Sequence, residues 1–240
     1  MIKSFAYIFL SAISLTSLSF CVLPAASAEE TTNRMVKNIE GWQVSVDPEI
    51  LTAENAEIGK EALKALANHL QRVKYIVPEN RVKQLQTLRI WIDWDHKLGN
   101  MQYHPSRGWL EKNGHDPNLT RHVHVPRAKQ LLSRSQWAKH PYVILHELAH
   151  AYHDQIIGFE QPQVIADFEA AKNAGLYKEV LLFTGQKVKH YALTNHKEYF
   201  AESTEAYFGM NDFYPFVRAE LKEYDPRTHQ LMEDIWGKIR

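Results

Sequence analysis

The chain has 240 residues, with 28 basic residues, 28 acidic residues and a single cysteine. Because the charges balance, the composition gives no argument for binding to nucleic acid or to an anionic membrane surface. A chain of this length can bury a sizeable core, so we expect one compact domain that needs no disulfide bonds.

Residues 1–28 have the features of a secretory signal peptide. A positive charge precedes an apolar stretch, and Ala26-Ser27-Ala28 matches the small-residue cleavage pattern. An uncleaved anchor is one alternative, but the apolar stretch is short and rich in serine. Lipid attachment at Cys21 is another, but Phe20 before it is bulky where such signals carry a small residue. We predict cleavage after Ala28 and no membrane span in the remaining chain. The loss of the only cysteine favours a bacterial secreted or periplasmic protein.

The first half of the chain is predicted to contain strands and one long helix. Alternating apolar side chains predict three strands, at residues 42–46, 88–93 and 122–125. The last of these is expected near a sheet edge because Pro126 ends it. Apolar residues at helical spacing predict a helix over 52–77 with Thr52 as its N-cap. Residues 29–37 are polar, and we expect them to be frayed.

The second half is predicted to be mainly helical. Its apolar periodicity and its capping residues predict four helices, at residues 141–158, 163–174, 196–209 and around 229–236. Strands followed by helices predict an α+β fold, with a small N-terminal sheet region packed on a helical core. We expect a single domain over 29–240, with a cleft-forming α/β half at 29–135 and a helical metal-binding half at 136–240.

The segment His146-Glu147-Leu148-Ala149-His150 is an H-E-x-x-H motif on a predicted helix. Residues four apart share a helix face, so His146 and His150 can hold one metal ion, and Glu147 can reach a water beside it. The helix is apolar nearly all round and therefore buried, so its polar side chains need partners that a metal supplies. The metzincin pattern is excluded because its glycine and third histidine positions are His153 and Ile156.

A hydrolytic zinc site needs a third protein ligand, and the helix at 196–209 offers carboxylates. Glu198 and Glu202 are four residues apart and share a face. One can bind the metal while the other accepts a hydrogen bond from the distal nitrogen of a ligand histidine. We favour Glu198 as the ligand, with Glu202, Asp167 and Glu169 as rivals. Glu205 is expected to be an exposed or structural carboxylate.

With these two helices, the chain resembles the gluzincin peptidases, and particularly the lethal-factor catalytic domain and the Mlc titration factor peptidases. The segment from Glu198 to Glu202 matches the second motif of that group, and Tyr191 stands seven residues before Glu198, as in the lethal-factor pattern. The resemblance covers residues 141–210. It implies one Zn²⁺ per chain with Glu198 as third ligand, Glu202 in support, and Tyr191 facing the reacting carbonyl.

These features predict a secreted zinc-dependent metallopeptidase acting on a peptide or protein substrate. Zinc acidifies its bound water, and Glu147 takes the proton as general base. Zinc and the Tyr191 hydroxyl then stabilise the oxyanion, although a tyrosine in this position is often only a core residue. The alternative is a non-catalytic zinc-binding envelope or secreted protein. Glu147 separates the two hypotheses, because a purely structural site needs no base.

The region 94–124 is rich in histidine and aromatic residues, and three interpretations are open. It can be a structured loop packed on the core, which we favour. It can instead form the substrate cleft, with contacts from Tyr103, His104, His122 and His124 and pairing of an extended peptide with an edge strand. A second metal site through His122 and His124 is the third interpretation, since a strand places them on one face.

Three further histidines flank the predicted metal site. His153 lies one turn beyond the H-E-x-x-H segment, and we expect it to support the ligands or to interact with the helix end. His190 and His196 could contact substrate, but we favour a surface role for each.

Overall fold

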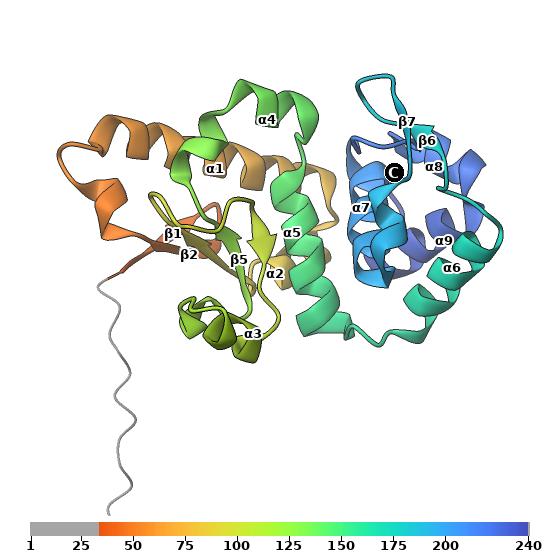
Figure 1. Cartoon of the computed structure of the whole chain (residues 1–240), viewed down its shortest axis with the longest axis horizontal. Helices are drawn as coiled ribbons and strands as arrows, with labels where there is room; N and C mark the ends of the chain where they lie inside the picture. Colours follow the sequence, from red (N-terminus) through yellow and green to blue (C-terminus); the bar gives the residue numbers. More distant parts are fainter. Residues whose placement is uncertain (1–33, 240) are drawn as a thin grey trace, which may run out of the picture. The chain divides into compact units, whose positions relative to one another are not determined.

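The structure is a computed structural model that describes residues 34–239 (Figure 1). The predicted signal peptide at residues 1–28 lies outside the described residues. Within them, a mixed sheet formed by the first half of the chain is followed by a mainly helical second half, which confirms the predicted α+β fold. No helix between residues 34 and 239 is both long and apolar enough to cross a bilayer.

The main sheet has the strand order β1-β2-β3-β5-β4. Its strands are β1 (Met35–Ile39), β2 (Trp42–Val46), β3 (Arg89–Ile92), β4 (Gln102–Tyr103) and β5 (His122–Val125). β2, β3 and β5 run parallel, while β1 and β4 pair antiparallel with their neighbours. The three predicted strands are therefore present. Residues 35–37, which we expected to be frayed, instead belong to β1, and the sheet edge next to β5 is formed by β4.

The two faces of the sheet are covered by different helices. Ile90 and Ile92 of β3 point into the main core with α1 (Ala56–Ile76), whereas Trp91 packs against Leu110 of α3 (Arg107–Lys112). Figure 1 shows α1 and α3 on opposite sides of the strands. Because successive side chains of a strand alternate between faces, β3 is buried on both.

The long helix α1 begins later than predicted. Thr52 ends a short 3-10 helix, Pro48–Leu51, and α1 starts after Asn55. Asp47 and a proline at the first position start that short helix, which gives the chain a turn before α1. Pro78 follows the helix end as predicted, and the preceding residue is extended.

The second half is built from helices. Its helices are α4 (Arg134–Lys139), α5 (Val143–Tyr152), α6 (Pro162–Asn173), α7 (His196–Phe208), α8 (Arg218–Tyr224) and α9 (Pro226–Trp236), with a hairpin of β6 (Val180–Leu181) and β7 (Lys187–Val188). Helix α2 (Glu79–Leu85) belongs to the first half, between α1 and β3. The four predicted helices correspond to α5, α6, α7 and α9. α5 continues as a π-helix, His153–Ile157, which Gly158 ends with a φ of 82° that favours glycine.

The core of this half forms where α5, α7 and α9 pack together. Trp236 of α9 is fully buried and stacks on Phe200 of α7, with the ring centroids 5.8 Å apart. Tyr152 at the end of α5 meets the same indole at 4.3 Å. This packing fixes α5 against α7, the two helices that carry the predicted metal ligands.

Candidate metal centre and cleft

Three predicted ligands meet between α5 and α7. The Nε2 atoms of His146 and His150 lie 3.1 Å apart. Glu198 Oε2 lies 3.1 Å from His150 Nε2 and 3.3 Å from His146 Nε2. Glu198 reaches this position from the first turn of α7, which begins where the Asn195 side chain accepts hydrogen bonds from the backbone N–H groups of Lys197 and Glu198.

The spacing of these three atoms fits a tetrahedral zinc ion. Zinc bonds to nitrogen and oxygen are about 2.0–2.1 Å long, so neighbouring ligand atoms in a tetrahedral site lie about 3.3 Å apart. The three measured separations come close to that edge length. The chemistry also fits, because two imidazoles and one carboxylate leave a fourth position open. Although burial alone would raise it, hydrogen bonds to His146 and His150 hold the pKa of Glu198 well below its usual range.

The orientation of His146 is set by Glu205. His146 Nδ1 donates to Glu205 Oε1 at 2.6 Å, and His140 Nε2 donates to the same oxygen at 2.9 Å. A carboxylate on the distal nitrogen of a ligand histidine fixes its tautomer and its aim. Glu205 is fully buried, so of the two roles that we expected for it, exposed or structural, the structural one is found.

Glu202 does not make the hydrogen bond that we expected of it. Its Oε1 lies 3.8 Å from His146 Nδ1, beyond hydrogen-bond distance, and its Oε2 accepts from Asn211 Nδ2 at 2.9 Å. Glu202 nevertheless lies beside the centre, and burial raises the pKa of its carboxyl. The i, i+4 spacing placed Glu202 near the site, but Glu205, a further turn along α7, is the partner of His146.

Glu147 is held by the edge strand of the sheet. Its Oε2 accepts a hydrogen bond from the backbone N–H of Tyr103 in β4 at 2.8 Å. The side chain is buried, and this burial raises the pKa of the carboxyl. A carboxylate with a raised pKa is a stronger base than one in water, which suits proton transfer near neutral pH.

A cleft of about 900 Å³ opens over the three ligand residues and Glu147. Residues 98–103, which lead into β4, line it from the first half of the chain. Tyr191, Leu182 and Phe213 line it from the second half. Tyr191 is about half exposed in a 3-10 helix just before α7. Partial burial and the charge of Glu198 raise the pKa of its phenol, so the hydroxyl keeps a proton to donate.

The other predicted substrate contacts are placed differently. Only Tyr103 lines the main cleft, while His104 lines a smaller neighbouring pocket of about 370 Å³. His124 is fully buried and lies 3.0 Å from His104, Nδ1 to Nε2. His122 Nδ1 bonds to the backbone oxygen of Thr120 at 3.0 Å. His122 and His124 therefore lie outside the cleft, because β4 covers the side of β5 on which a peptide would pair.

The remaining candidate residues, Asp167 and three histidines, make packing or hydrogen-bond contacts outside the group of metal ligands. Asp167, a rival ligand, pairs with Arg227 at 2.5 Å and is absent from the metal centre. His153 is fully buried, and neither of its ring nitrogens has a hydrogen-bond partner within residues 34–239. His190, expected at the surface, is buried and stacks on Phe213 at 4.8 Å. His196 bonds to the backbone oxygen of Phe159 at 2.9 Å.

His140 is the functional candidate that sequence reasoning did not single out. It lines the cleft and shares Glu205 with His146. Burial alone would lower its pKa, but the Glu205 carboxylate raises it above the usual value. The only signal in the sequence is the position of Glu205 seven residues after Glu198, which places both on one face of α7.

A family model described as anthrax toxin lethal factor, N- and C-terminal domain, matches residues 119–235. This segment contains α5, α7 and all the residues of the metal centre. No curated protein and no solved structure matches the chain. The match relates the second half of the chain to lethal factor, as the motif spacing predicted, without singling out one of the domains in that description. The segment before residue 119, which includes β4, lies outside the matched region.

Proposed function

We propose that this protein is an exported zinc-dependent metallopeptidase. The observation that carries the proposal is the group of His146, His150 and Glu198 at zinc-like separations, with Glu147 beside it in an open cleft. The relation to lethal factor over residues 119–235 supports it. A peptide or protein is the substrate class that an amide-hydrolysing site of this kind accepts.

His146, His150 and Glu198 would hold the ion, and a bound zinc would acidify a water molecule and polarise the carbonyl to be attacked. In this proposal Glu147 accepts the proton of the attacking water and returns it to the leaving amine. The Tyr103 N–H keeps the Glu147 carboxylate at the cleft floor. The Tyr191 hydroxyl can donate a hydrogen bond to the developing oxyanion.

The rival hypothesis is a zinc-binding protein without turnover. Such a protein has no use for a base, and a structural site usually closes its fourth position with another ligand. The buried Glu147 beside an open cleft favours the peptidase hypothesis. Binding to nucleic acid or to an anionic membrane through a basic surface has no support, because the chain carries no net charge.

The test is cleavage of a peptide library by the zinc-loaded wild type and by Glu147→Gln. We expect the wild type to cleave, and the variant to bind the same amount of zinc but to lose at least about 100-fold in rate, because the base has been removed. Asp167→Asn removes a carboxylate away from the metal centre, and this control shows whether the loss of any one carboxylate lowers the cleavage rate. If both the wild type and Glu147→Gln bind zinc and neither cleaves, the protein is not a peptidase.

A further inference from the structure

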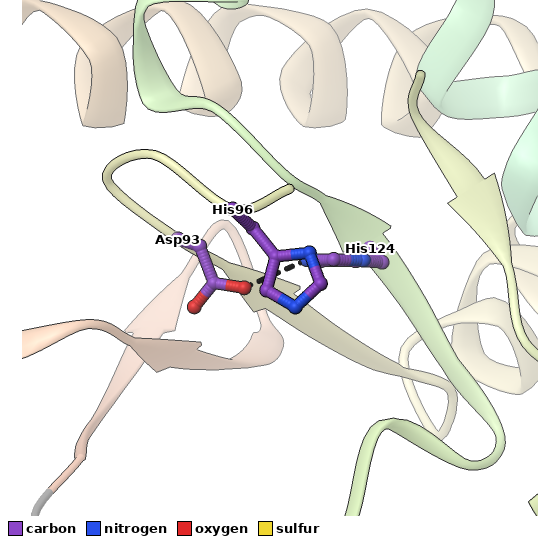
Figure 2. A group of neighbouring side chains, drawn as sticks. All are labelled: Asp93, His96 and His124. Carbon is purple, nitrogen blue, oxygen red and sulfur yellow. Dashed lines mark hydrogen bonds and ion pairs between the residues drawn. The ribbon is translucent and has the colours of Figure 1, made fainter. Parts of the chain in front are cut away.

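A second group of metal-ligating side chains lies at the end of β3 and β5, apart from α5 and α7. Asp93 Oδ2 and His124 Nε2 are 2.8 Å apart. The His96 ring stands edge-on to that of His124, with centroids 5.0 Å apart (Figure 2). One ligand atom from each of the three residues lies within 4.8 Å of the others.

The backbone brings these residues together. β3 and β5 are parallel, and Trp91 stands opposite His124. The chain continues beyond β3, and the Asp93 N–H donates to the backbone oxygen of Val125 at 2.9 Å. The next loop is tied back over β5 by the N–H of His96, which donates to the oxygen of Pro126 at 2.7 Å. Backbone hydrogen bonds therefore hold Asp93, His96 and His124 close to one another.

The hydrogen bonds of Asp93 leave one of its oxygens to face the histidines. Arg34 Nη1 and Trp91 Nε1 both donate to Oδ1, at 2.7 Å and 3.1 Å. Oδ2 has His124 as its hydrogen-bond partner among residues 34–239. With an ion on Nε2, His124 would carry its proton on Nδ1 and donate it to His104, so that the 3.0 Å contact is kept. An ion would thus replace the buried 2.8 Å hydrogen bond between Asp93 Oδ2 and His124 Nε2 with its own bonds to these two atoms, while the contact with His104 is kept.

The group can be reached by an ion from one side. His96 is only partly buried, so an ion can approach from its side, whereas His124 is fully enclosed.

We propose that Asp93, His96 and His124 form a second site for a divalent transition-metal ion of the zinc class, separate from the centre on α5 and α7. Mixed nitrogen and oxygen ligands suit zinc and its neighbours better than magnesium or calcium. The site ties the loop after Asp93 to β5, and residues 98–103 of that segment form a wall of the cleft. The ion therefore acts as a clamp on this wall and takes no part in the reaction.

The second site is expected to bind more weakly than the first. The ligand atoms of the group lie within 4.8 Å of one another, and His96 must close any excess over about 3.3 Å, the edge length of a tetrahedral zinc site. The guanidinium of Arg34, beside Asp93, also repels a cation. Both costs are absent at the first centre, where the ligand atoms already stand 3.1–3.3 Å apart.

The experiment is equilibrium dialysis against zinc, followed by metal analysis, for the full protein and four variants. We expect about two zinc ions per chain for the wild type and for His122→Gln, which changes the same face of β5 outside the group. His96→Gln and Glu198→Gln should each retain about one, and the double variant none. Equal zinc content in His96→Gln and His122→Gln would overturn the proposal, as would a wild type whose zinc is all lost in Glu198→Gln.

A second measurement keeps the result independent of the first centre and of folding. In the Glu198→Gln background, zinc should raise the melting temperature, and adding His96→Gln should weaken that response at least about tenfold in zinc concentration. His96 lies on a partly exposed loop, so both proteins should melt alike in chelator. If the two proteins respond to zinc in the same way, the second site is contradicted. If instead Glu198→Gln binds as much zinc as the wild type, the first centre, and with it the proposed function, is contradicted.

Discussion

His146 depends on Glu205, a residue that does not touch the metal position. The 2.6 Å hydrogen bond from Nδ1 turns Nε2 toward His150 and Glu198. His140 donates to the same carboxylate, so Glu205 is fully buried with two imidazole partners. A buried carboxylate needs such partners, because an unpaired one would be protonated.

We therefore predict that Glu205→Gln weakens zinc binding about 10–100-fold, the usual effect of losing the partner of a ligand histidine. Glu202→Gln is the matched control on the same helix face, and it should change zinc affinity much less because Glu202 contacts Asn211 instead. Competition with a chromophoric chelator measures both affinities. The reverse order of effects would restore Glu202 as the partner of His146.

The contact between α5 and α7 also depends on a glycine. Gly209 ends α7, and a Cβ at this position would overlap the ring of Tyr142, which precedes α5. Tyr142 packs against the core, and the Arg72 guanidinium lies 4.9 Å from its ring. The ring cannot retreat freely, so the absence of a side chain at Gly209 is what allows the two ligand-bearing helices to approach.

We predict that Gly209→Ala lowers the free energy of unfolding by about 1–3 kcal/mol, the usual cost of overpacking. Gly108→Ala in α3 is the matched control, since a Cβ there meets nothing within 4 Å and should be neutral or slightly stabilising. Urea unfolding followed by circular dichroism gives both values. An unchanged midpoint for Gly209→Ala would show that Tyr142 moves aside without cost.

The predictable elements are those with a strong local pattern. α1, α5 and α7 have clear periodicity or capping, and β2, β3 and β5 alternate or are rich in apolar residues. β4 is only two residues long and exists through its pairing with β5, so no local pattern marks it. The π-helix after α5 depends likewise on tertiary packing.

In the metal centre, too, the residues set by local spacing were predictable and the contacts set by tertiary packing were not. The motif spacing brought His146, Glu147, His150 and Glu198 into one place as expected. The exchange of Glu202 for Glu205 follows from how α5 crosses α7, which spacing along one helix does not determine. The contact of Glu147 with Tyr103 joins residues from opposite halves of the chain, and no sequence pattern indicates it.

At the scale of the whole molecule, the protein buries several neutral histidines. Burial lowers the pKa of His69 to about 4, with Arg72 and His140 adding to the effect. His69 stacks on Trp137, with ring centroids 4.0 Å apart. In the unfolded chain a histidine titrates near 6.5, so between pH 6.5 and 4 the unfolded state binds more protons. The stability due to neutral His69 is thus complete above the unfolded pKa and is lost as the pH falls.

We predict that His69→Gln reduces the loss of stability between pH 7 and pH 4 by up to about 3 kcal/mol, because glutamine does not titrate. The free energy of urea unfolding at both pH values, measured in chelator, gives the comparison with wild type. If the variant and the wild type lose the same stability on acidification, His69 does not contribute to the acid sensitivity.

The molecule combines a helical half related to lethal factor with a first half that forms one wall of the cleft. The catalytic proposal depends on a bound metal, so the most direct measurement is peptide-library cleavage after chelation and after zinc is returned. We predict that a chelator abolishes cleavage and that about one equivalent of zinc restores most of it, since the first centre fills before the second. Cleavage that persists in the chelator, or a zinc-loaded protein that cleaves no peptide, would contradict the proposed function.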